Sequence, residues 1–217
     1  MREDVIQSVM KNRIIVIVRD VAENKLLPLT ESLYLGGIRL IEITYGSSDD
    51  LETAKSIEML KEKFDGKMHI GAGTILTEKQ VELTKTAGGE FIVSPNVFPD
   101  LITKSLQLGM VSIPGALTPS EICIAQRAGA DFIKLFPASN MGEEYIKAVL
   151  APLKGLRLLA VGGINTDNLI KYLAAGACGV GIGKNIVNRH LLASDAYDEI
   201  SALAGRYVNI TKTWSAK

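Results

Sequence analysis

The 217-residue chain is long enough to bury a sizeable core, and α/β barrels of this length commonly form one domain, so we expect a single domain over residues 1–217. Its 24 basic and 24 acidic side chains balance, and no run of five or more Lys or Arg residues occurs. The sequence therefore lacks the charge signature of a nucleic-acid-binding protein, and any anionic ligand must be held by local groups.

The cysteines, histidines and apolar runs narrow the class further. Cys123 and Cys178 show no CxxC spacing, and His69 and His190 are the only histidines, so we expect no metal site and two free thiols in a reducing cytoplasm. Met1 is followed by charged residues, and no apolar run approaches about 18 residues, so we expect a cytoplasmic protein without an export or membrane segment.

Short apolar runs alternate with amphipathic stretches after a first short helix at Glu3–Lys11. Eight runs have strand character: Ile14–Val18, Ile38–Ile43, Met68–Ala72, Glu90–Ser94, Met110–Ile113, Asp131–Leu135, Arg157–Val161 and Gly179–Ile182. The helical stretches between them, several opened by Ser, Thr or Asp and closed by Gly, are Glu23–Leu35, Asp49–Phe64, Glu78–Ala87, Pro99–Leu108, Pro119–Ala128, Glu143–Leu150, Asp167–Ala175 and Asp195–Lys212.

This alternation predicts an α/β fold, a parallel (β/α)8 TIM barrel with a short N-terminal helix. The alternative is a doubly wound open sheet, which usually has fewer strands and one phosphate-binding turn. In a barrel the chemistry belongs at the C-terminal ends of the strands, and polar residues and special turns do collect there. Because side chains alternate along a strand, each of three strands has one face that carries both apolar and reactive groups. These faces are Ile15, Ile17 and Arg19; Leu40, Glu42 and Thr44; and Phe132 and Lys134.

Lys134 is the only cation in the apolar run Asp131–Pro137. It shares a face with Phe132, so we expect its ammonium to lie beside an aromatic ring near the end of the strand. Burial there lowers a lysine pKa from its usual value of about 10.4 and exposes a lone pair that can attack a carbonyl and form a Schiff base. The structural alternative is a lysine that reaches solvent or pairs with a carboxylate.

Glu42 lies between Ile41 and Ile43 in another apolar strand. A carboxylate placed there costs several kcal/mol to ionise unless a cation or donor meets it, and Lys134 or Arg19 could do so. Schiff-base chemistry needs such a pair, because a neighbouring carboxylate moves protons on and off the carbinolamine and the substrate. The alternative is a purely structural ion pair.

Glycine turns follow the last two strands, at Gly162 and Gly163 and at Gly183, the last of which precedes Lys184. Barrels of this kind hold phosphate in the loops after strands seven and eight, where glycines let backbone N–H groups approach an anion. Lys184 could add a full positive charge. The sequence therefore predicts a phosphate site, although turns need glycines in any case.

Six segments carry a family resemblance: Ile41-Glu42-Ile43-Thr44, Gly71-Ala72-Gly73-Thr74, Phe91-Ile92-Val93-Ser94-Pro95, Pro114-Gly115-Ala116-Leu117-Thr118-Pro119, Phe132-Ile133-Lys134-Leu135-Phe136-Pro137-Ala138 and Gly162-Gly163-Ile164. Over about Ile14 to Ile186 the chain resembles the bacterial 2-keto-3-deoxy-6-phosphogluconate (KDPG) aldolases, also called 4-hydroxy-2-oxoglutarate aldolases. That family consists of class I, metal-free barrels that form a Schiff base. The resemblance thus implies an aldolase that needs no cofactor.

The resemblance also assigns roles. It makes Lys134 the Schiff-base lysine, Glu42 the proton shuttle, Thr74 a contact of the keto-acid end, Arg19 the arginine after strand one, and Gly162 with Gly163 the phosphate glycines. Thr44, Pro95 and Phe136 lie in the matched motifs and complete the expected substrate-binding set.

The activity that the resemblance implies is reversible cleavage of a 2-keto-3-deoxy-6-phospho sugar acid to pyruvate and glyceraldehyde 3-phosphate. The alternatives are cleavage of 4-hydroxy-2-oxoglutarate to pyruvate and glyoxylate, and a 6-phosphogalactonate-type substrate. The family's usual homotrimer is expected on the same ground alone.

Two departures bear on the substrate. Many members carry an arginine shortly after the strand-two glutamate, where it helps to bind the substrate carboxylate, but this sequence has Gly46 there. Arg19 or backbone donors could offset the loss, or the substrate could differ. Where some relatives have a serine beside the phosphate, this chain has Lys184.

Two other functions fit part of the pattern. A sugar-phosphate isomerase or epimerase would use carboxylate acid/base chemistry and need no lysine imine. A non-catalytic sugar-phosphate-binding barrel would keep Glu42 and Lys134 only as a buried ion pair.

Overall fold

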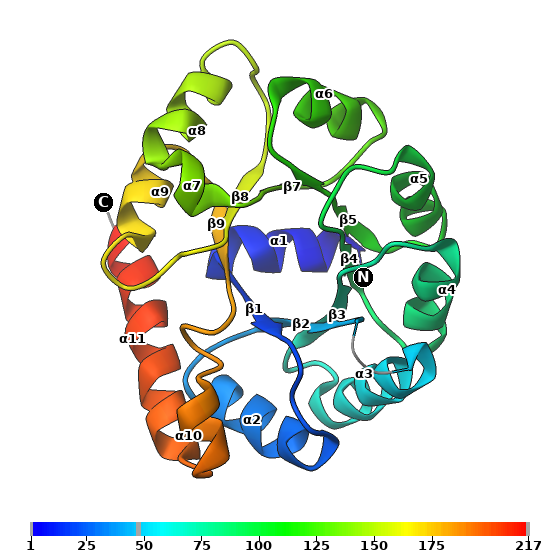
Figure 1. Ribbon diagram of the computed structural model, residues 1–217, viewed down its shortest axis with the longest axis vertical. Coiled ribbons are helices and arrows are strands. Elements are labelled where there is room, and N and C mark those ends of the chain that lie inside the picture. The colour runs from blue at the N-terminus through cyan, green and yellow to red at the C-terminus, as the bar shows by residue number, and fades with distance from the viewer. Residues whose placement is uncertain (1, 47–48, 216–217) are drawn as a thin grey trace.

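The computed structural model describes residues 2–46 and 49–215, which form a ring of parallel strands surrounded by helices (Figure 1). The strands of this part are β1 (Ile14–Val18), β2 (Leu40–Thr44), β3 (His69–Gly73), β4 (Phe91–Val93), β5 (Val111–Ile113), β6 (Gly115–Ala116), β7 (Ile133–Leu135), β8 (Leu158–Val161) and β9 (Gly179–Ile182). They hydrogen-bond in the order β5-β4-β3-β2-β1-β9-β8-β7-β6. The predicted barrel is confirmed, and the open doubly wound sheet is not what forms.

The strand predicted at Met110–Ile113 continues past Pro114 as two short strands. β5 pairs with β4, and β6 pairs with β7, while the Lys134 N–H donates to the Pro114 carbonyl oxygen at 2.8 Å. Proline has no N–H to give to a ladder, so the fifth strand of the ring changes neighbours at that residue. The nine strands of the described chain are therefore the eight predicted ones with a proline break in the fifth.

The helices cover the outside of the ring, except for the first. Their bounds are α1 (Arg2–Asn12), α2 (Glu23–Leu35), α3 (Asp50–Phe64), α4 (Glu78–Thr86), α5 (Pro99–Gln107), α6 (Pro119–Arg127), α7 (Ala138–Met141), α8 (Glu143–Leu150), α9 (Leu169–Ala174), α10 (Arg189–Ala193) and α11 (Tyr197–Ser215). Side-chain caps start several of them, as in α6, where Thr118 and Glu121 form a capping box.

Some helices begin at other residues than predicted, because side chains there accept hydrogen bonds from backbone N–H groups. The expected helix Asp167–Ala175 begins only at Leu169, because the Asn165 side chain accepts from the N–H groups of Asp167 and Asn168 and holds a turn there. The expected helix Asp195–Lys212 begins at Tyr197, and α10, which Asn188 caps, precedes it without having been predicted.

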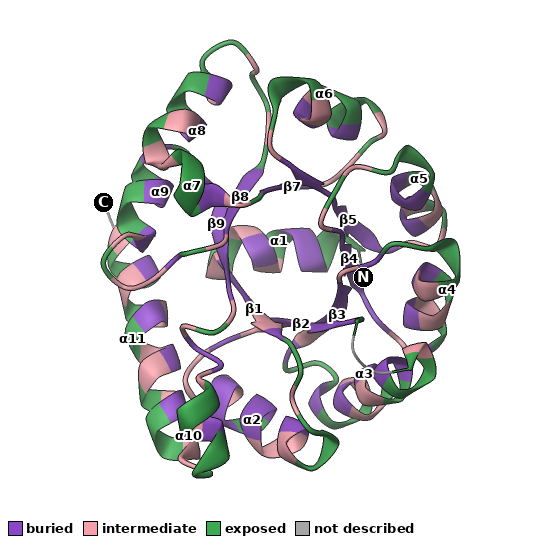
Figure 2. Ribbon diagram, viewed as in Figure 1, coloured by how far each residue is buried: buried purple, intermediate pink, exposed green. Residues whose placement is uncertain are grey.

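The N-terminal helix α1 lies across one open end of the ring, at its N-terminal side (Figure 1). Val5, Ile6 and Val9 of α1 are buried together with side chains that point into the barrel, including Phe91 and Phe132. The strands are buried apart from the half-buried Ile17 and His69, whereas the helices are exposed on their outer faces (Figure 2). The short helix that sequence patterns predicted is therefore the floor of the barrel.

The larger buried cluster lies between the strands and the outer helices and contains side chains such as Leu29, Ile57 and Ile200. Within the described residues, no helix combines the length and the apolar character that crossing a lipid bilayer requires.

The tight interior makes a stability prediction at Gly71 of β3. A Cβ added there would lie 2.5 Å from the ring of Phe91, which is fully buried. Gly71→Ala should therefore lower the free energy of unfolding by about 1–3 kcal/mol through overpacking, as measured by urea denaturation. The control is Gly205→Ala in α11, whose new Cβ would meet only the Gly36 carbonyl oxygen at 3.8 Å. That change should stabilise by about 0.5–1 kcal/mol, and equal signs for the two variants would contradict the packing described.

Candidate active site

A cavity of about 610 Å³ opens at the C-terminal ends of the strands, on the side of the barrel opposite α1. Ten of the eleven side chains or glycines predicted for the site line it: Arg19, Glu42, Thr74, Pro95, Lys134, Phe136, Gly162, Gly163, Gly183 and Lys184. They come from the ends of seven different strands, or from the loops that follow them, and are brought together because parallel strands of a barrel end at the same face.

Thr44 is the predicted residue that does not line this cavity. It is 8% exposed and lines a neighbouring cavity of about 580 Å³ between β1, β2, α2 and α3. Its side chain lies close to Gly73, since a Cβ added there would be 3.1 Å from Thr44 Cγ2. Thr44 therefore borders the wall of the site next to Glu42 and does not face the cavity itself.

Lys134 is the middle residue of β7 and is 8% exposed. Its Nζ lies 4.9 Å from the centre of the Phe136 ring, so the aromatic neighbour is Phe136 and not the predicted Phe132. Burial lowers the pKa of Lys134, and the charge of Arg19 lowers it further, while Glu42 acts in the opposite direction. The environment thus favours the neutral amine, which is the nucleophilic form.

Glu42 of β2 is 2% exposed and faces the same space as Lys134. Burial raises the pKa of Glu42, and the positive charges of Lys134 and Arg19 oppose that rise. The part of the chain that the structure describes contains no direct Glu42–Lys134 salt bridge, so the two charges act on each other across the cavity. Both groups are therefore shifted toward their neutral forms, which is the direction that proton exchange between them favours.

Gly73 gives the Glu42 carboxylate its room. A Cβ at this position would lie 2.4 Å from Glu42 Oε1, a distance that no side chain can occupy. The next residue, Thr74, has a positive φ of 58°, and its hydroxyl accepts a hydrogen bond of 2.7 Å from Arg19 Nη2. The Gly-Ala-Gly-Thr segment therefore seats both the carboxylate and the guanidinium of the site.

Arg19 extends into the site beside Gly46. A Cβ added to Gly46 would be 3.9 Å from Arg19 Nη1, the nearest heavy atom. The guanidinium of Arg19 thus occupies the neighbourhood of Gly46, where the family resemblance led us to expect an arginine. Ser47, the next residue of that motif, lies outside the described residues.

The two glycine loops form the other end of the cavity. Gly162 and Gly163 have φ values of 96° and 75°, and a Cβ on Gly163 would lie 2.4 Å from Ser139 of α7. Asn185 Nδ2 donates to the Ile164 carbonyl oxygen at 2.7 Å and ties the loops together. Packing against α7 alone explains Gly163, so the glycine doublet is needed by the fold whether or not it binds an anion.

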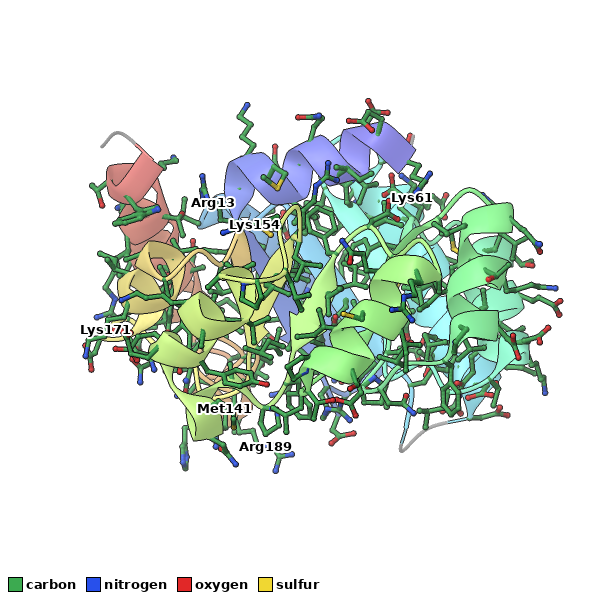
Figure 3. All side chains as sticks on the ribbon, turned by 90° about the horizontal axis from the view of Figure 1, so that it is seen from above. Arg13, Lys61, Met141, Lys154, Lys171 and Arg189 are labelled. Carbon is green, nitrogen blue, oxygen red and sulfur yellow. The ribbon has the colours of Figure 1, made fainter. Side chains whose placement is uncertain are left out.

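Sequence reasoning missed several residues of the cavity mouth, notably Asp20 and Arg189. Arg189 Nη2 lies 3.8 Å from Asp20 Oδ2, and both residues line the cavity. Figure 3 shows Arg189 on the face of the molecule opposite α1. Their signal was positional, because Asp20 directly follows Arg19 and Arg189 begins α10 in the connection after the last strand. Across the described residues, no group of three or more His, Cys, Asp or Glu side chains could hold a metal ion.

Comparisons with known proteins agree with this geometry. The family model described as KDPG and KHG aldolase matches residues 5–203. The chain is 36% identical over 199 residues to a probable 2-dehydro-3-deoxy-6-phosphogalactonate aldolase of Rhizobium meliloti, covering 91% of this chain and 92% of that protein. It is 32% identical over 214 residues to a 2-dehydro-3-deoxy-phosphogluconate aldolase of Haemophilus influenzae, covering 97% and 98%.

The fold also matches that of a solved structure. The KDPG aldolase of Legionella pneumophila, crystallised with pyruvate captured as a covalent carbinolamine intermediate, superposes with a TM-score of 0.84 at 28% identity. The match covers 92% of this chain and 96% of that one. The cavity contains the lysine and the carboxylate that the family resemblance implies, and the family model and the relatives match most of the chain. The chain therefore belongs to the KDPG and KHG aldolase family of carbon–carbon lyases.

Proposed function

We propose that the protein is a class I aldolase that uses Lys134 to cleave a 2-keto-3-deoxy-6-phospho sugar acid reversibly into pyruvate and glyceraldehyde 3-phosphate. The observation that carries this proposal is the buried amine of Lys134, whose pKa is lowered, facing Glu42, whose pKa is raised, in one cavity. An isomerase or epimerase would need the carboxylate but would have no use for a nucleophilic amine.

The first steps belong to Lys134. Its neutral Nζ adds to the C2 ketone of the substrate to form a carbinolamine, which loses water to give a protonated imine. The positive imine then accepts the electron pair of the C3–C4 bond as that bond breaks, so that the aldehyde departs and an enamine of pyruvate remains. The Phe136 ring, 4.9 Å from Nζ, stabilises positive charge at this nitrogen.

Glu42 moves the protons. It accepts the proton of the C4 hydroxyl as the C3–C4 bond breaks, which turns that carbon into the aldehyde, and it returns a proton to C3 of the enamine. Hydrolysis of the resulting imine then releases pyruvate and restores the amine. A carboxylate whose pKa is raised by burial suits both directions of transfer, because it holds a proton more readily than an exposed carboxylate does.

The carboxylate end of the substrate fits the Arg19 side of the cavity. Arg19 is held by its bond to Thr74 and retains other N–H groups for a carboxylate. Its position beside Gly46 supports the idea that Arg19 takes over the task of the missing arginine. Pro95 and Phe136 supply apolar walls between this end and the glycine loops.

The phosphate end fits the loops after β8 and β9. In the described part of the chain, the backbone N–H groups of Gly163 and Gly183 donate to no protein acceptor. Lys184 is exposed at the same rim and lines the cavity. Helix α9 has only six residues, so its dipole adds little, and the anion would rely on these N–H groups and on Lys184.

A second candidate substrate is the galacto isomer, 2-dehydro-3-deoxy-6-phosphogalactonate. It is favoured by the name of the Rhizobium relative, which is 36% identical against 32% for the Haemophilus phosphogluconate aldolase. Both substrates need the same imine and proton transfers and differ only at one hydroxyl-bearing carbon. Cleavage of 4-hydroxy-2-oxoglutarate would follow if the phosphate loops contribute little.

Two further expectations stay predictions. The homotrimer implied by the family resemblance can be checked by sedimentation of the purified protein. The cytoplasmic location rests on the free cysteines Cys123 and Cys178, which a reducing compartment would preserve.

The experiment that tests the proposal is reductive trapping. Pyruvate with borohydride should add the mass of the reduced adduct to a single lysine, and peptide mass spectrometry should place it at Lys134. Lys134→Ala should abolish trapping while leaving the protein folded, whereas Lys171→Ala, which removes an exposed lysine, should change nothing. Trapping that persists at another lysine in Lys134→Ala would refute the assignment.

Replacement of the carboxylate separates imine formation from proton transfer. Glu42→Gln should lower turnover by roughly 10²–10⁴ while leaving pyruvate trapping measurable. It should also lower the pKa of Lys134, because the negative charge that favours the ammonium is lost. Acylation of Lys134 by acetic anhydride across a pH series measures that pKa. The matched control is Glu58→Gln on the surface of α3; near-normal turnover in Glu42→Gln would leave Glu42 a structural role only.

Substrate preference tests the phosphate end. Lys184→Ala should reduce kcat/KM for a phosphorylated substrate by roughly tenfold or more, since a charge-assisted contact is worth about 1.5–3 kcal/mol, and should scarcely affect an unphosphorylated keto acid. Lys154→Ala makes the same change at an exposed site on the side of the barrel near α1 (Figure 3) and should have no effect. Equal wild-type efficiency on both substrates would mean that the loops serve the fold and not the ligand.

A further inference from the structure

Helix α1 closes the barrel from the side opposite the cavity. It crosses the N-terminal opening in face view and runs along the edge of the molecule in side view, away from Arg189 (Figures 1 and 3). Val5 and Val9 are completely buried and Ile6 is 6% exposed, and all three belong to the cluster that fills the barrel interior. α1 is therefore part of the barrel core and not an appendage.

One layer of apolar side chains separates α1 from the reactive pair. Leu40 and Phe132 are in the same cluster as Val5 and Val9, and each stands two positions before a reactive residue on the inward face of its strand. The residues that follow in this way are Glu42 after Leu40 and Lys134 after Phe132. The cover that α1 provides thus lies about two layers of side chains below the two charges.

A small void lies at the boundary between these layers. It measures about 10 Å³ and is bounded by Glu42 and Lys134 above and by apolar side chains such as Ile15, Val93 and Leu159. A space of roughly 10–15 Å³ is the smallest that holds a water molecule. The void beneath Lys134 and Glu42 is therefore at the lower limit of the size that could admit one. Any loosening of the layer would let water reach both charges.

Both ends of α1 are tied to the barrel. At its start, Arg2 forms a two-point contact with Asp131, with Nη2–Oδ1 at 2.6 Å and Nε–Oδ2 at 3.3 Å, and Asp131 Oδ2 also accepts from the Ser112 N–H. At its end, the Arg13 N–H donates to Val9 and its guanidinium donates to the Cys178 carbonyl. Asp131 stands three residues before Lys134, so the first tie joins α1 to the segment that carries the amine.

We infer that α1 is a positioning element of the active site: by sealing the N-terminal mouth of the barrel, it ensures that water reaches Lys134 and Glu42 only from the substrate side. Arg2 is the positioning residue that sets how firmly the seal closes. This inference rests on the proposed function, because it concerns the reactivity of the proposed Schiff-base lysine.

The charged groups that face Lys134 come from elements other than α1, so α1 affects the amine through its access to water. Glu42 faces Lys134 from β2 and Arg19 from the end of β1, while Asp20, Lys184 and Arg189 stand at the cavity mouth. On the side of α1, the hydrophobic cluster lies beneath Lys134, and the Arg157 guanidinium borders it with its carbon 5.7 Å from the centre of the Phe132 ring. Since burial is the largest influence on the pKa of Lys134, water admitted from below would raise it and reduce the fraction of reactive amine at pH 7.

The test uses Val9→Thr, which keeps the side-chain shape but places a hydroxyl in the sealed layer, and Arg2→Gln, which breaks the tie and leaves the layer unchanged. The control is Val149→Thr on α8, a buried valine of the outer helix layer, which should destabilise without touching the barrel interior. In both test variants the backbone amide hydrogens of α1 should exchange with deuterium faster than in the wild type. The pKa of Lys134, from acetic anhydride acylation across pH, should rise by on the order of one unit, a part of the 3–5 units that full burial can produce.

Pyruvate trapping should then slow by up to about tenfold at pH 7 and recover when the pH is raised by the same shift, which mere structural damage would not do. A wild-type pKa of Lys134 in variants whose α1 exchanges faster would overturn the inference, as would an equal shift in Val149→Thr or unchanged α1 exchange in both test variants. If wild-type protein forms no pyruvate adduct, the proposed function fails, while the acylation series still decides whether α1 controls Lys134.

Discussion

Two opposite charges lie inside an apolar barrel without direct contact, and much of the structure follows from that constraint. Removing Lys134 and Glu42 from water costs several kcal/mol, and their attraction across the cavity repays only part of it. The remaining cost appears as shifted proton affinities, which is the property that imine chemistry requires. The stable scaffold therefore serves to hold an arrangement that would be unfavourable by itself.

Small residues on β3 make this arrangement possible. Gly71 and Gly73 occupy positions where an added Cβ would strike Phe91 and Glu42, respectively. Without side chains at these two positions, the inner face of β3 leaves space for the Phe91 ring in the layer nearer α1 and for the Glu42 carboxylate in the layer nearer the cavity. The same backbone then turns at Thr74 into a positive φ that brings its hydroxyl to Arg19. One five-residue strand and the threonine after it thus position the Phe91 ring, the Glu42 carboxylate and the Arg19 guanidinium together.

The sequence was most informative where a signal was local and periodic. Period-two alternation predicted that Leu40 and Glu42, and Phe132 and Lys134, point inward, and the barrel brings them together as expected. It failed where distant groups decide the outcome. The proline break at Pro114 shows only when β4 and β7 are both in place, Thr44 turns out to border a different cavity, and Arg189 approaches Asp20 through the closing of the ring. The role of α1 as the floor was likewise hidden, because amphipathicity tells which face is apolar but not what covers it.

The order of synthesis gives α1 an unusual history. Val5, Ile6 and Val9 leave the ribosome before the strands that bury them, since the cluster around them includes residues as late as Val161, and the ring closes only when β9 pairs with β1 at Val16 and Ile182. A nascent chain cannot bury this apolar face against its native neighbours until β8 and β9 have been made. Helix α1 is thus made before the strands that cover it, and its apolar face stays open to water until they have folded.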